Sequence, residues 1–405
     1  MSRMPLQGHR IIELGSMLAA PFAAHILSQL GAEVIKVEPP TGDTTRALVR
    51  GGPSGTFIAY NHGKKSVCLD LAHPEGADAF RALLATADAL VHNLSPKAAR
   101  KLKVTRAECE AVNPRLIYCH IRGYAEGPQQ DDLASNPVAE AATGVMEANR
   151  IDGRPSRLGP SYHDQFAGAY AVIGILSSML QASAGEEPAP VEIGLYETGL
   201  HVASRDLVGL QLKTQLLGKA EREPHGEFSM PGYGAYRTAD ERWIYLLMLT
   251  DAHWQKFCRA MGMPQGEAFA TLRQRKKARE AVESAVRGAM GALRFEEAVT
   301  RLSSEGLGFT EVLPLERVLE SPQAQHPGKL RPLSFRSYDF AVPEFPRPGS
   351  GEGPTCPPPA LGEHTAELLA QAGITRDAYG ALLASGAAAD ATTDRFHWTP
   401  VRREG

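Results

Sequence analysis

The sequence predicts an α/β fold, with a parallel sheet in its first half and a smaller α+β domain after it. Short apolar runs alternate with helical patterns through the first half of the 405 residues, as they do in successive βαβ units. From about Val202 this alternation stops, and strand-like and helical segments follow in a different order. With 43% hydrophobic and 22% charged residues, the composition is that of a globular protein long enough for about two domains.

Each expected strand of the sheet is a short apolar run bounded by polar or turn-forming residues. In chain order these runs are Arg10–Leu14, Glu33–Val37, Ser66–Asp70, Ala89–Asn93, Leu116–Ile121 and Val191–Tyr196. Between the first two, apolar residues recur at helical spacing, with Pro21 suited to the first turn and Gly31 to the C-cap. The turn from Gly15 to Pro21 lacks the GxGxxG spacing of a dinucleotide site, so we expect no NAD or FAD here.

The small α+β domain is expected over residues 203–328. Its expected elements are a strand at Trp243–Leu249 and helices at 252–263 and 278–302. Residues 1–202 would form the first part of the large domain. Residues 329–405 would be a linker and a C-terminal segment that returns to the large domain, ending in a short helix over Thr365–Gln371.

The net charge of −3 gives no general attraction to nucleic acid or to an anionic membrane. The basic run Arg273–Lys277 has no interleaved aromatic residues, so it indicates a solvated helix face and not a nucleic-acid contact. The apolar run 167–182 is interpreted as too short, and too interrupted by polar residues, to span a bilayer. Partners are therefore expected among small molecules.

The five cysteines lack the spacing of a metal site: Cys68, Cys109, Cys119, Cys258 and Cys356. We expect neither zinc nor a disulfide, and reduced thiols are typical of a cytoplasmic protein. The first ten residues also lack the apolar core of a signal peptide, so cytoplasmic localisation is expected.

Asp164 stands immediately before the longest apolar helical run of the chain, Ala169–Leu180. The first N–H groups of a helix lack intrahelical partners and carry the positive end of the dipole, so they stabilise a carboxylate or a developing oxyanion. Most aspartates in this place are only helix caps. We interpret Asp164 as a candidate nucleophile that is held ionised, with a plain cap as the alternative.

Sequence blocks along the chain fit one family pattern in order and spacing. They are Glu13–Leu14, Ala20–Pro21, Leu30–Glu38, Gly42–Asp43, Arg46, Phe57, Asn61, Gly63–Ser66, Leu69–Leu71, Ala87–Asp88, Asn93, Pro96, Asn113–Tyr118, Gly123–Tyr124, Gly127–Pro128 and Leu361–Thr365. On these blocks the chain resembles the class III CoA-transferases (the CaiB/BaiF family, formyl-CoA transferase-like) over nearly its whole length.

The resemblance implies a Rossmann-like large domain whose sheet is built from N-terminal and C-terminal segments, and an interlocked homodimer. It also implies that Asp164 attacks an acyl-CoA thioester, forming an aspartyl anhydride and then an aspartyl-CoA thioester that an acceptor carboxylic acid resolves. Backbone N–H groups near Asp164 would stabilise the oxyanion. CoA and acyl-CoA would be substrates, with no permanently bound cofactor and no metal.

The resemblance also points to residues that bind CoA. They are Met17, Leu18 and Ala19 after the first strand, Leu69, Asp70, Leu71 and Ala72 after the third, and Asn93, Leu94 and Lys101 after the fourth. Charge and position add further phosphate candidates: Arg46, Lys65, Lys36, Lys64 and Arg100. Four residues near Asp164 are candidates for a second substrate carboxylate: Arg122, Arg154, Arg157 and Tyr162.

The chain departs from the family pattern at Asn136, where many relatives carry an acidic residue. An Asn is no general acid or base, and Ser135–Asn136 replaces the His-Asp pair with which the racemase branch moves a proton. His163 is interpreted as a structural or orienting residue. The alternatives to CoA transfer between two acids are intramolecular CoA transfer within one acid, a racemase, and a non-catalytic CoA-binding subunit.

Overall fold

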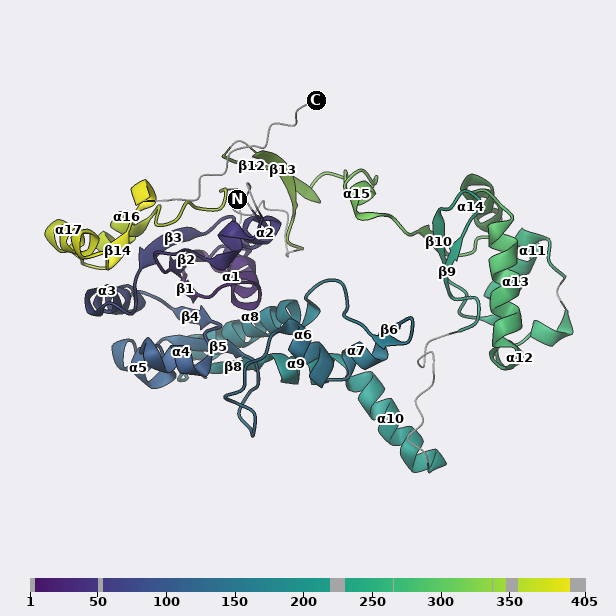
Figure 1. Ribbon diagram of the computed structural model, residues 1–405, viewed down its shortest axis with the longest axis horizontal. Helices are drawn as coiled ribbons and strands as arrows, with labels where there is room; N and C mark the ends of the chain where they lie inside the picture. Colours follow the sequence, from purple (N-terminus) through teal and green to yellow (C-terminus); the bar gives the residue numbers. More distant parts are fainter. Residues whose placement is uncertain are drawn as a thin grey trace. The chain divides into compact units, whose positions relative to one another are not determined.

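The computed structural model describes residues 4–49, 54–218, 230–264, 266–336, 338–346 and 356–393 (Figure 1). The chain divides into two compact units. The large unit comprises residues 1–204 and 327–405, and the small unit comprises residues 205–326. Each unit is described by itself.

The large unit is built on a seven-stranded sheet in the order β14-β3-β2-β1-β4-β5-β8. Its strands are β1 (Arg10–Leu14), β2 (Glu33–Glu38), β3 (Lys65–Leu69), β4 (Ala89–His92), β5 (Ile117–Arg122), β8 (Val191–Gly194) and β14 (Ala388–Ala389). All neighbours pair in parallel except β14, which pairs antiparallel with β3 and brings the C-terminal segment into the sheet. The α/β fold class and its N-terminal strands are therefore confirmed.

Apolar side chains fill both faces of this sheet, as its continuous apolar runs predict. One face packs against α1 (Ala19–Gln29) and α8 (Tyr162–Ser183). The other packs against α3 (Pro74–Leu84) and the C-terminal helices α16 (Thr365–Gln371) and α17 (Arg376–Ser385). The predicted return of the C-terminal segment to the large unit thus supplies two helices as well as one strand.

Shorter elements complete the large unit. They are η1 (Thr44–Ala47), α2 (Gly55–Asn61), α4 (Pro96–Lys101), α5 (Arg106–Val112), α6 (Asn136–Ala142), α7 (Val145–Ala148), β6 (Arg150–Ile151), β7 (Arg154–Pro155), α9 (Leu195–Val202) and η3 (Ala391–Thr393). The region expected as a linker contains the hairpin β12 (Leu330–Phe335) and β13 (Tyr338–Pro343), which packs on Ile58 of α2. The expected strand Val191–Tyr196 ends early, because Leu195 already begins α9.

The small unit has a three-stranded antiparallel sheet of β9 (Gly234–Arg237), β10 (Trp243–Leu246) and β11 (Phe309–Glu311). Its helices are α10 (Ser204–Leu217, which starts one residue before the unit), α11 (Asp251–Met261), η2 (Glu267–Phe269), α12 (Leu272–Lys277), α13 (Arg279–Gly291), α14 (Phe295–Ser304) and α15 (Leu315–Val318). The expected helix 278–302 is two helices, separated after Gly291, whose residue type is a poor helix former.

The basic run at 273–277 is only partly the solvated face that the sequence predicts. Arg275 is buried, donates a hydrogen bond to Asp251 at 2.8 Å and lies over the ring of Trp254. It therefore belongs to the core of the small unit.

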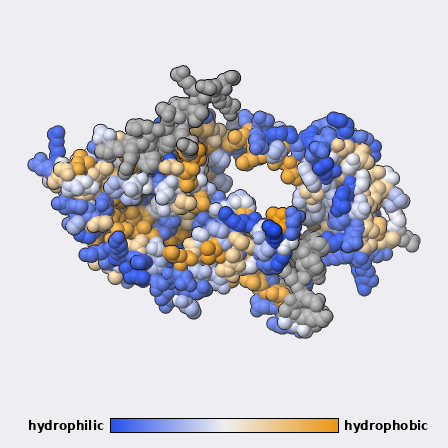
Figure 2. All heavy atoms as spheres, in the orientation of Figure 1, coloured by the Kyte–Doolittle hydropathy of each residue, from blue (hydrophilic) through white to orange (hydrophobic). Residues whose placement is uncertain are grey.

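Helix α8 is 22 residues long and apolar enough to cross a membrane by length and composition, so the expectation that this run is too short is wrong. Its packing supplies another reason for the apolar sequence, because Ala167, Ala171 and Ile175 lie in the core beside α1 and the sheet. The exposed side of α8 is also apolar in part, at Phe166 and Ile173. Figure 2 shows apolar side chains interspersed with hydrophilic ones on the visible surface of the large unit.

Candidate active site

Asp164 lies partly buried in the first turn of α8, which begins directly after Ser161. The side chain of Ser161 makes no capping hydrogen bond. Asn136 of α6 takes that role from a distant part of the chain. Its side-chain oxygen accepts the backbone N–H of His163 at 2.9 Å and that of Asp164 at 3.3 Å.

This cap changes the expected chemistry of the helix N-terminus. The N–H groups of His163 and Asp164 are already occupied by Asn136, so they are not open donors for an oxyanion in this structure. Asn136 itself, which the sequence marked only as a missing acid, is a helix cap of the kind that aspartate, asparagine and serine provide.

The environment of Asp164 raises its pKa to about 6. Burial is the largest cause, the positive charge of Arg157 opposes the rise, and the negative charge of Glu140 adds to it. The positive end of the helix dipole alone would lower the pKa of Asp164, so the effect of burial outweighs the effect of the dipole. Asp164 is therefore mostly ionised at neutral pH, as expected, but it is more basic than an ordinary aspartate.

His163 packs its ring between Thr143 and Gly199 of α9. Its ring is buried against Thr143, at 3.4 Å from Nε2 to the hydroxyl, and lies where a Cβ on Gly199 of α9 would be 2.6 Å away. Burial lowers the pKa of His163. These contacts fit the structural role expected from the sequence.

In doubly wound α/β sheets the ligand crevice is expected where the strand order reverses, which in this sheet is at the carboxyl ends of β1 and β4. Asn93 joins the two strand ends there: its amide donates to the carbonyl of Ser16 at 2.9 Å and accepts the N–H of Ser16 at 3.1 Å. The neighbouring Met17 has a left-handed backbone, with φ at 66°, and an exposed side chain. The structure thus brings together the expected CoA-binding residues after β1 (Met17, Leu18, Ala19) and after β4 (Asn93, Leu94).

Gly168 lets the Asp164 helix reach this crevice. A Cβ at Gly168 would lie 2.8 Å from the carbonyl oxygen of Ala19 and 3.0 Å from the ring of Phe22, so only glycine permits this approach of α8 to α1. Gly168 was not predicted from the sequence as a site residue. Its signal was a glycine inside an apolar helix, four residues after Asp164.

The residues expected after the third strand lie at the carboxyl end of β3, two strands from β1. Leu69 and Leu71 are buried in the core under α3, and the carboxylate of Asp70 accepts the N–H of Ala72 at 2.9 Å. Only the exposed Ala72 of this group presents its side chain freely to solvent.

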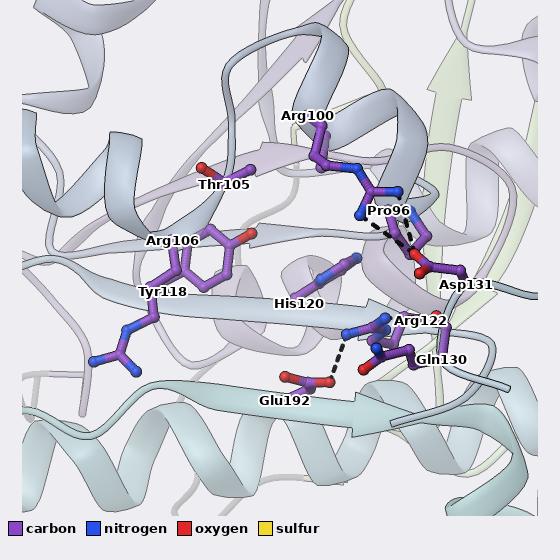
Figure 3. Close-up of a pocket in the computed structure, with 11 residues that line it drawn as sticks. Pro96, Arg100, Thr105, Arg106, Tyr118, His120, Arg122, Gln130, Asp131 and Glu192 are labelled. Atoms are coloured by element: carbon purple, nitrogen blue, oxygen red, sulfur yellow. Dashed lines mark hydrogen bonds and ion pairs between the residues drawn. The ribbon is translucent and has the colours of Figure 1, made fainter. Parts of the chain in front are cut away.

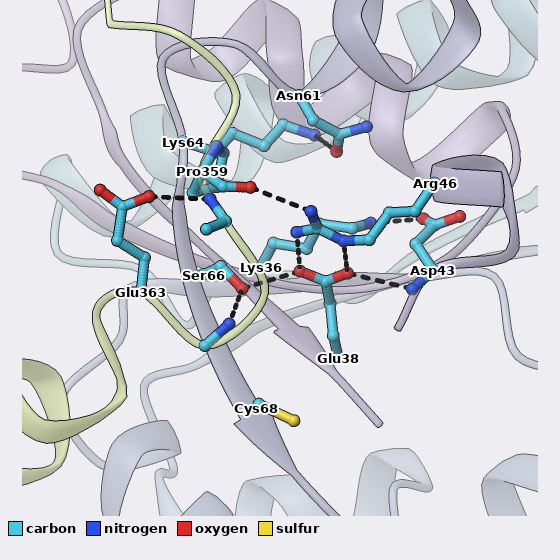
Figure 4. Close-up of polar contacts among 12 residues, drawn as sticks. Lys36, Glu38, Asp43, Arg46, Asn61, Lys64, Ser66, Cys68, Pro359 and Glu363 are labelled. Atoms are coloured by element: carbon cyan, nitrogen blue, oxygen red, sulfur yellow. Dashed lines mark hydrogen bonds and ion pairs between the residues drawn. The ribbon is translucent and has the colours of Figure 1, made fainter. Parts of the chain in front are cut away.

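Three of the expected phosphate ligands are buried in a charge network (Figure 4). Lys36 and Lys64 both contact Glu13, at 2.7 and 2.6 Å, and Arg46 makes a paired contact with Glu38. All five of these side chains lie in the interior. Arg46, Lys36 and Lys64 are therefore wrong as phosphate ligands, because their charges are neutralised inside the protein.

Two lysines of this network nevertheless contact the backbone at the turn between β1 and α1. The ammonium of Lys36 also donates to the carbonyl of Gly15 at 3.0 Å, and that of Lys64 donates to the carbonyl of Pro21 at 2.9 Å. These two bonds hold both ends of the turn that carries Met17. Lys36 and Lys64 thus contact the predicted CoA-binding turn from inside the protein and do not present their charges to a phosphate.

Lys65 is also wrong as a phosphate ligand, for a topological reason. It starts β3 and pairs with Glu33, the first residue of β2, so it lies at the amino edge of the sheet, opposite the crevice. Arg100 and Lys101 end α4, and Arg100 forms an ion pair with Asp131 at 3.2 Å. Lys101 is exposed and makes no ion pair with a residue that the structure describes, which leaves it available to an anion.

A pocket of about 280 Å³ lies beside α4 and β5 (Figure 3). Its charged walls include Arg100 and Arg122, whose partners are Asp131 and Glu192, the latter at 2.8 Å from Arg122. Of the residues expected to bind CoA, only the phosphate candidate Arg100 lines this pocket, and Asp164 does not line it. Arg122 is thus engaged away from the nucleophile, and Arg157 is the arginine whose charge acts on Asp164. Among the described residues, no cluster of three metal-ligating side chains occurs.

The large unit is thus a doubly wound α/β domain that carries a partly buried aspartate in the first turn of α8. The model of CoA-transferase family III matches residues 6–365, and the chain belongs to this family. It is an enzyme of the CoA-transferase class.

Named relatives agree with this assignment. The succinate–glutarate CoA-transferase of Agrobacterium fabrum is 28% identical and covers 91% of this chain and 95% of its own. Human succinyl-CoA:glutarate CoA-transferase is 28% identical, over 94% of this chain and 89% of its own. The beta subunit of a succinyl-CoA–L-malate CoA-transferase from Chloroflexus aurantiacus is 32% identical, over 65% and 66%. A solved CaiB/BaiF family protein from Brucella suis superposes with a TM-score of 0.80 at 25% identity, over 92% of this chain and 100% of that one.

Proposed function

We propose that the protein moves CoA from succinyl-CoA to a second carboxylic acid through covalent intermediates on Asp164. The three CoA-transferases named above support the substrate class, because their names pair succinate or succinyl-CoA with glutarate or L-malate, and further relatives are named for D-citramalate and mesaconate. The observation that carries the mechanism is the placement of Asp164, a partly buried carboxylate in the first turn of α8 with its pKa raised to about 6.

In the proposed reaction, an Oδ of Asp164 attacks the thioester carbonyl and the C–S bond breaks, which gives an acyl–aspartyl anhydride and CoA thiolate. The thiolate then attacks the aspartyl carbonyl, releasing the donor acid and leaving an aspartyl-CoA thioester. An acceptor carboxylate attacks that thioester and the same two steps run in reverse. No step consumes water, and its exclusion preserves the anhydride.

The raised pKa suits this chemistry. At neutral pH the carboxylate is mostly ionised, as a nucleophile must be, and its higher basicity favours attack on a thioester. Desolvation, the main cause of the shift, also removes water that would compete for the anhydride.

Arg157 is the proposed partner of the distal carboxylate of a dicarboxylic acyl group. Its side chain is exposed, it makes no ion pair with any described residue, and its charge acts on Asp164. An arginine forms two parallel hydrogen bonds with a carboxylate, so it would favour succinyl over an uncharged acyl chain. Arg154 lies exposed on the small β6–β7 hairpin, and Arg122 is occupied by Glu192.

The proposed assembly is the interlocked homodimer implied by the family resemblance. An apolar stripe on the exposed side of α8 supports a partner surface: Phe166 is 41% exposed, Ile173 60% and Leu180 72%. These residues recur every seven positions and so share one side of the helix. Burying them against a second copy would remove a large apolar surface from water.

The racemase alternative loses support from the geometry, because Asn136 accepts hydrogen bonds from two backbone N–H groups and its amide is not a general acid or base.

Intramolecular CoA transfer would use the same Asp164 chemistry, so an experiment must distinguish it from transfer between two acids. The purified protein should exchange labelled free succinate into succinyl-CoA, and it should form a new acyl-CoA with at least one of glutarate, L-malate or mesaconate. Asp164→Asn is the control. If neither labelled succinate nor any acceptor acid exchanges with succinyl-CoA, the proposal is contradicted. If labelled succinate exchanges but no second acid is accepted, the enzyme is restricted to one acid.

A further inference from the structure

Glu140 is a carboxylate with no exposed surface, located on α6 one turn after Asn136. A buried carboxylate is costly unless hydrogen-bond donors replace the water that it has lost. Both of its oxygens are used. One accepts a short hydrogen bond from the side-chain amide of Asn136, and the other accepts the backbone N–H of Leu158 at 3.1 Å.

The first contact fixes which way the Asn136 amide faces. An asparagine side chain has an NH₂ end that donates and an oxygen end that accepts, whereas an ionised carboxylate only accepts. The NH₂ group of Asn136 must therefore face Glu140, and its oxygen must face the N–H groups of His163 and Asp164. Reversing the amide would set donors against donors at the start of α8.

The second contact anchors the segment that carries Arg157. Glu140 holds Leu158 on one side, and Asn149 donates to the carbonyls of Ser156 and Arg157 at 3.2 and 3.0 Å on the other. The backbone on both sides of Arg157 is thus pinned. One buried carboxylate therefore connects the helix cap behind Asp164 with the arginine beside it.

We propose that Glu140 is a positioning residue for the transfer reaction: it orients Asn136 to cap the nucleophile helix and anchors the segment that holds Arg157. The inference rests on the proposed function, since it takes Asp164 as the nucleophile. Glu140 does not touch substrate, because it is fully enclosed. Its negative charge also adds to the burial that raises the pKa of Asp164, against the opposing charge of Arg157.

Exchanging the carboxylate and the amide between positions 140 and 136 tests whether Glu140 orients Asn136. In Glu140→Gln, the new amide cannot accept from both Asn136 and Leu158, so one of the two contacts is lost. In the double variant Glu140→Gln with Asn136→Asp, the amide introduced at position 140 donates to the new carboxylate and accepts from Leu158, while that carboxylate caps α8. Glu147→Gln is the matched control, because it removes an exposed glutamate of α7 that pairs with Arg150.

Three readouts separate positioning from simple core packing: kcat and KM for succinyl-CoA across pH, amide hydrogen exchange of residues 159–166, and the melting temperature. Glu140→Gln should lower kcat about tenfold, the loss expected from one charge-assisted hydrogen bond, with a smaller change in KM. It should move the acidic limb of the pH profile to lower pH, because losing a neighbouring negative charge lowers the pKa of Asp164. Among the described residues, Arg157 is the other charged group that acts on Asp164, the titratable neighbours in the same turn of α8 are Tyr162 and His163, and Tyr60 of α2 accepts a hydrogen bond from the adjacent Gln165.

The amides at the start of α8 should exchange faster in Glu140→Gln and recover protection in the double variant, which should also regain most of the lost kcat. Glu147→Gln should match wild type. A Glu140→Gln enzyme with wild-type kcat, acidic limb and exchange would overturn the proposal, and so would a double variant no better than the single one.

Failure of the proposed function has a different signature. Wild type would then form no CoA adduct and would equal Asp164→Asn, while amide exchange would still report whether Glu140 orders α8. If Glu140→Gln does not fold, Asn136→Ala removes the cap directly and should show the same faster exchange and lower kcat; wild-type exchange and kcat in Asn136→Ala would overturn the proposal.

Discussion

Gly168 on α8 lies against Ala19 on α1 so closely that a Cβ on the glycine would be 2.8 Å from the alanine carbonyl oxygen. This approach sets the distance between α8, which carries the proposed nucleophile Asp164, and the start of α1, which follows the turn that holds Met17. The contact couples a packing detail to the geometry of the reaction.

Gly168→Ala should therefore impair catalysis more than folding. The added methyl forces α8 away from α1, at a cost of about 1–3 kcal/mol that the better helix propensity of alanine offsets in part. We expect kcat/KM to fall about tenfold or more. Gly174→Ala is the control in the same helix, where a Cβ would meet Val191 at 2.5 Å, far along α8 from Asp164. Equal losses of kcat/KM in the two variants would contradict this account.

Asn93→Ala should weaken CoA binding. It removes the donor and the acceptor that tie Ser16 to the end of β4, so the β1–α1 turn loses these two bonds and keeps its bonds to Lys36 and Lys64. The Kd for CoA should rise about tenfold by calorimetry, as for one or two lost hydrogen bonds. Asn113→Ala is matched, since its amide donates to the carbonyls of Leu84 and Ala87 at 3.3 and 2.8 Å away from the crevice. It should lower the melting temperature and leave the Kd unchanged.

Substitution of Arg46 should affect folding stability and not CoA binding, and substitution of Lys101 should do the reverse. Arg46→Ala removes the arginine that makes a paired ion contact with the buried Glu38 and should cost about 3–5 kcal/mol of folding free energy, without weakening CoA binding by the folded enzyme. Lys101→Ala should leave the melting temperature unchanged and raise the Kd for CoA several-fold, most strongly at low salt. A Kd that rises in Arg46→Ala but stays constant in Lys101→Ala would restore Arg46 as a phosphate ligand.

The raised pKa of Asp164 has a stability consequence that does not need substrate. A carboxyl group whose folded pKa of about 6 exceeds the ordinary 3.8 destabilises the folded state once it ionises. Asp164→Asn should therefore be more stable than wild type by about 2 kcal/mol at pH 7 to 8. That advantage should shrink as pH falls from about 6 to about 4. Denaturant melts at several pH values measure it, and a pH-independent difference would mean that the pKa is not raised.

The same shift sets the pH dependence of the reaction. Activity requires the carboxylate, so kcat/KM should fall tenfold per pH unit below about 6. An acidic limb near pH 4 would show that Asp164 is as acidic as an ordinary aspartate.

Local patterns were sufficient for much of this fold. The apolar runs at Arg10–Leu14 and Ala89–Asn93 predicted strands because both faces of a parallel strand are buried, a property visible in a few consecutive residues. Asp164 was predicted as the nucleophile because an acidic residue before a long apolar helix, together with the family resemblance, marks one position; that role stays a prediction.

Features that depend on distant partners could not be predicted in this way. Lys64 pairs with Glu13, 51 positions earlier, so its burial has no local signature. Glu140 acquires its role only when α6 meets α8, and a glutamate among alanines resembles any helical surface residue. The hairpin from Leu330 to Pro343 was missed because Pro332 and Pro343 argue against a strand, although edge strands tolerate proline.

The most direct test of covalent CoA transfer is the intact mass of the protein after incubation with succinyl-CoA, before and after hydroxylamine. Wild type should gain a CoA-sized adduct that hydroxylamine removes, and Asp164→Asn should gain none. A wild-type enzyme that turns over succinyl-CoA without any such adduct, or an Asp164→Asn variant that still forms it, would contradict catalysis through an aspartyl thioester at Asp164.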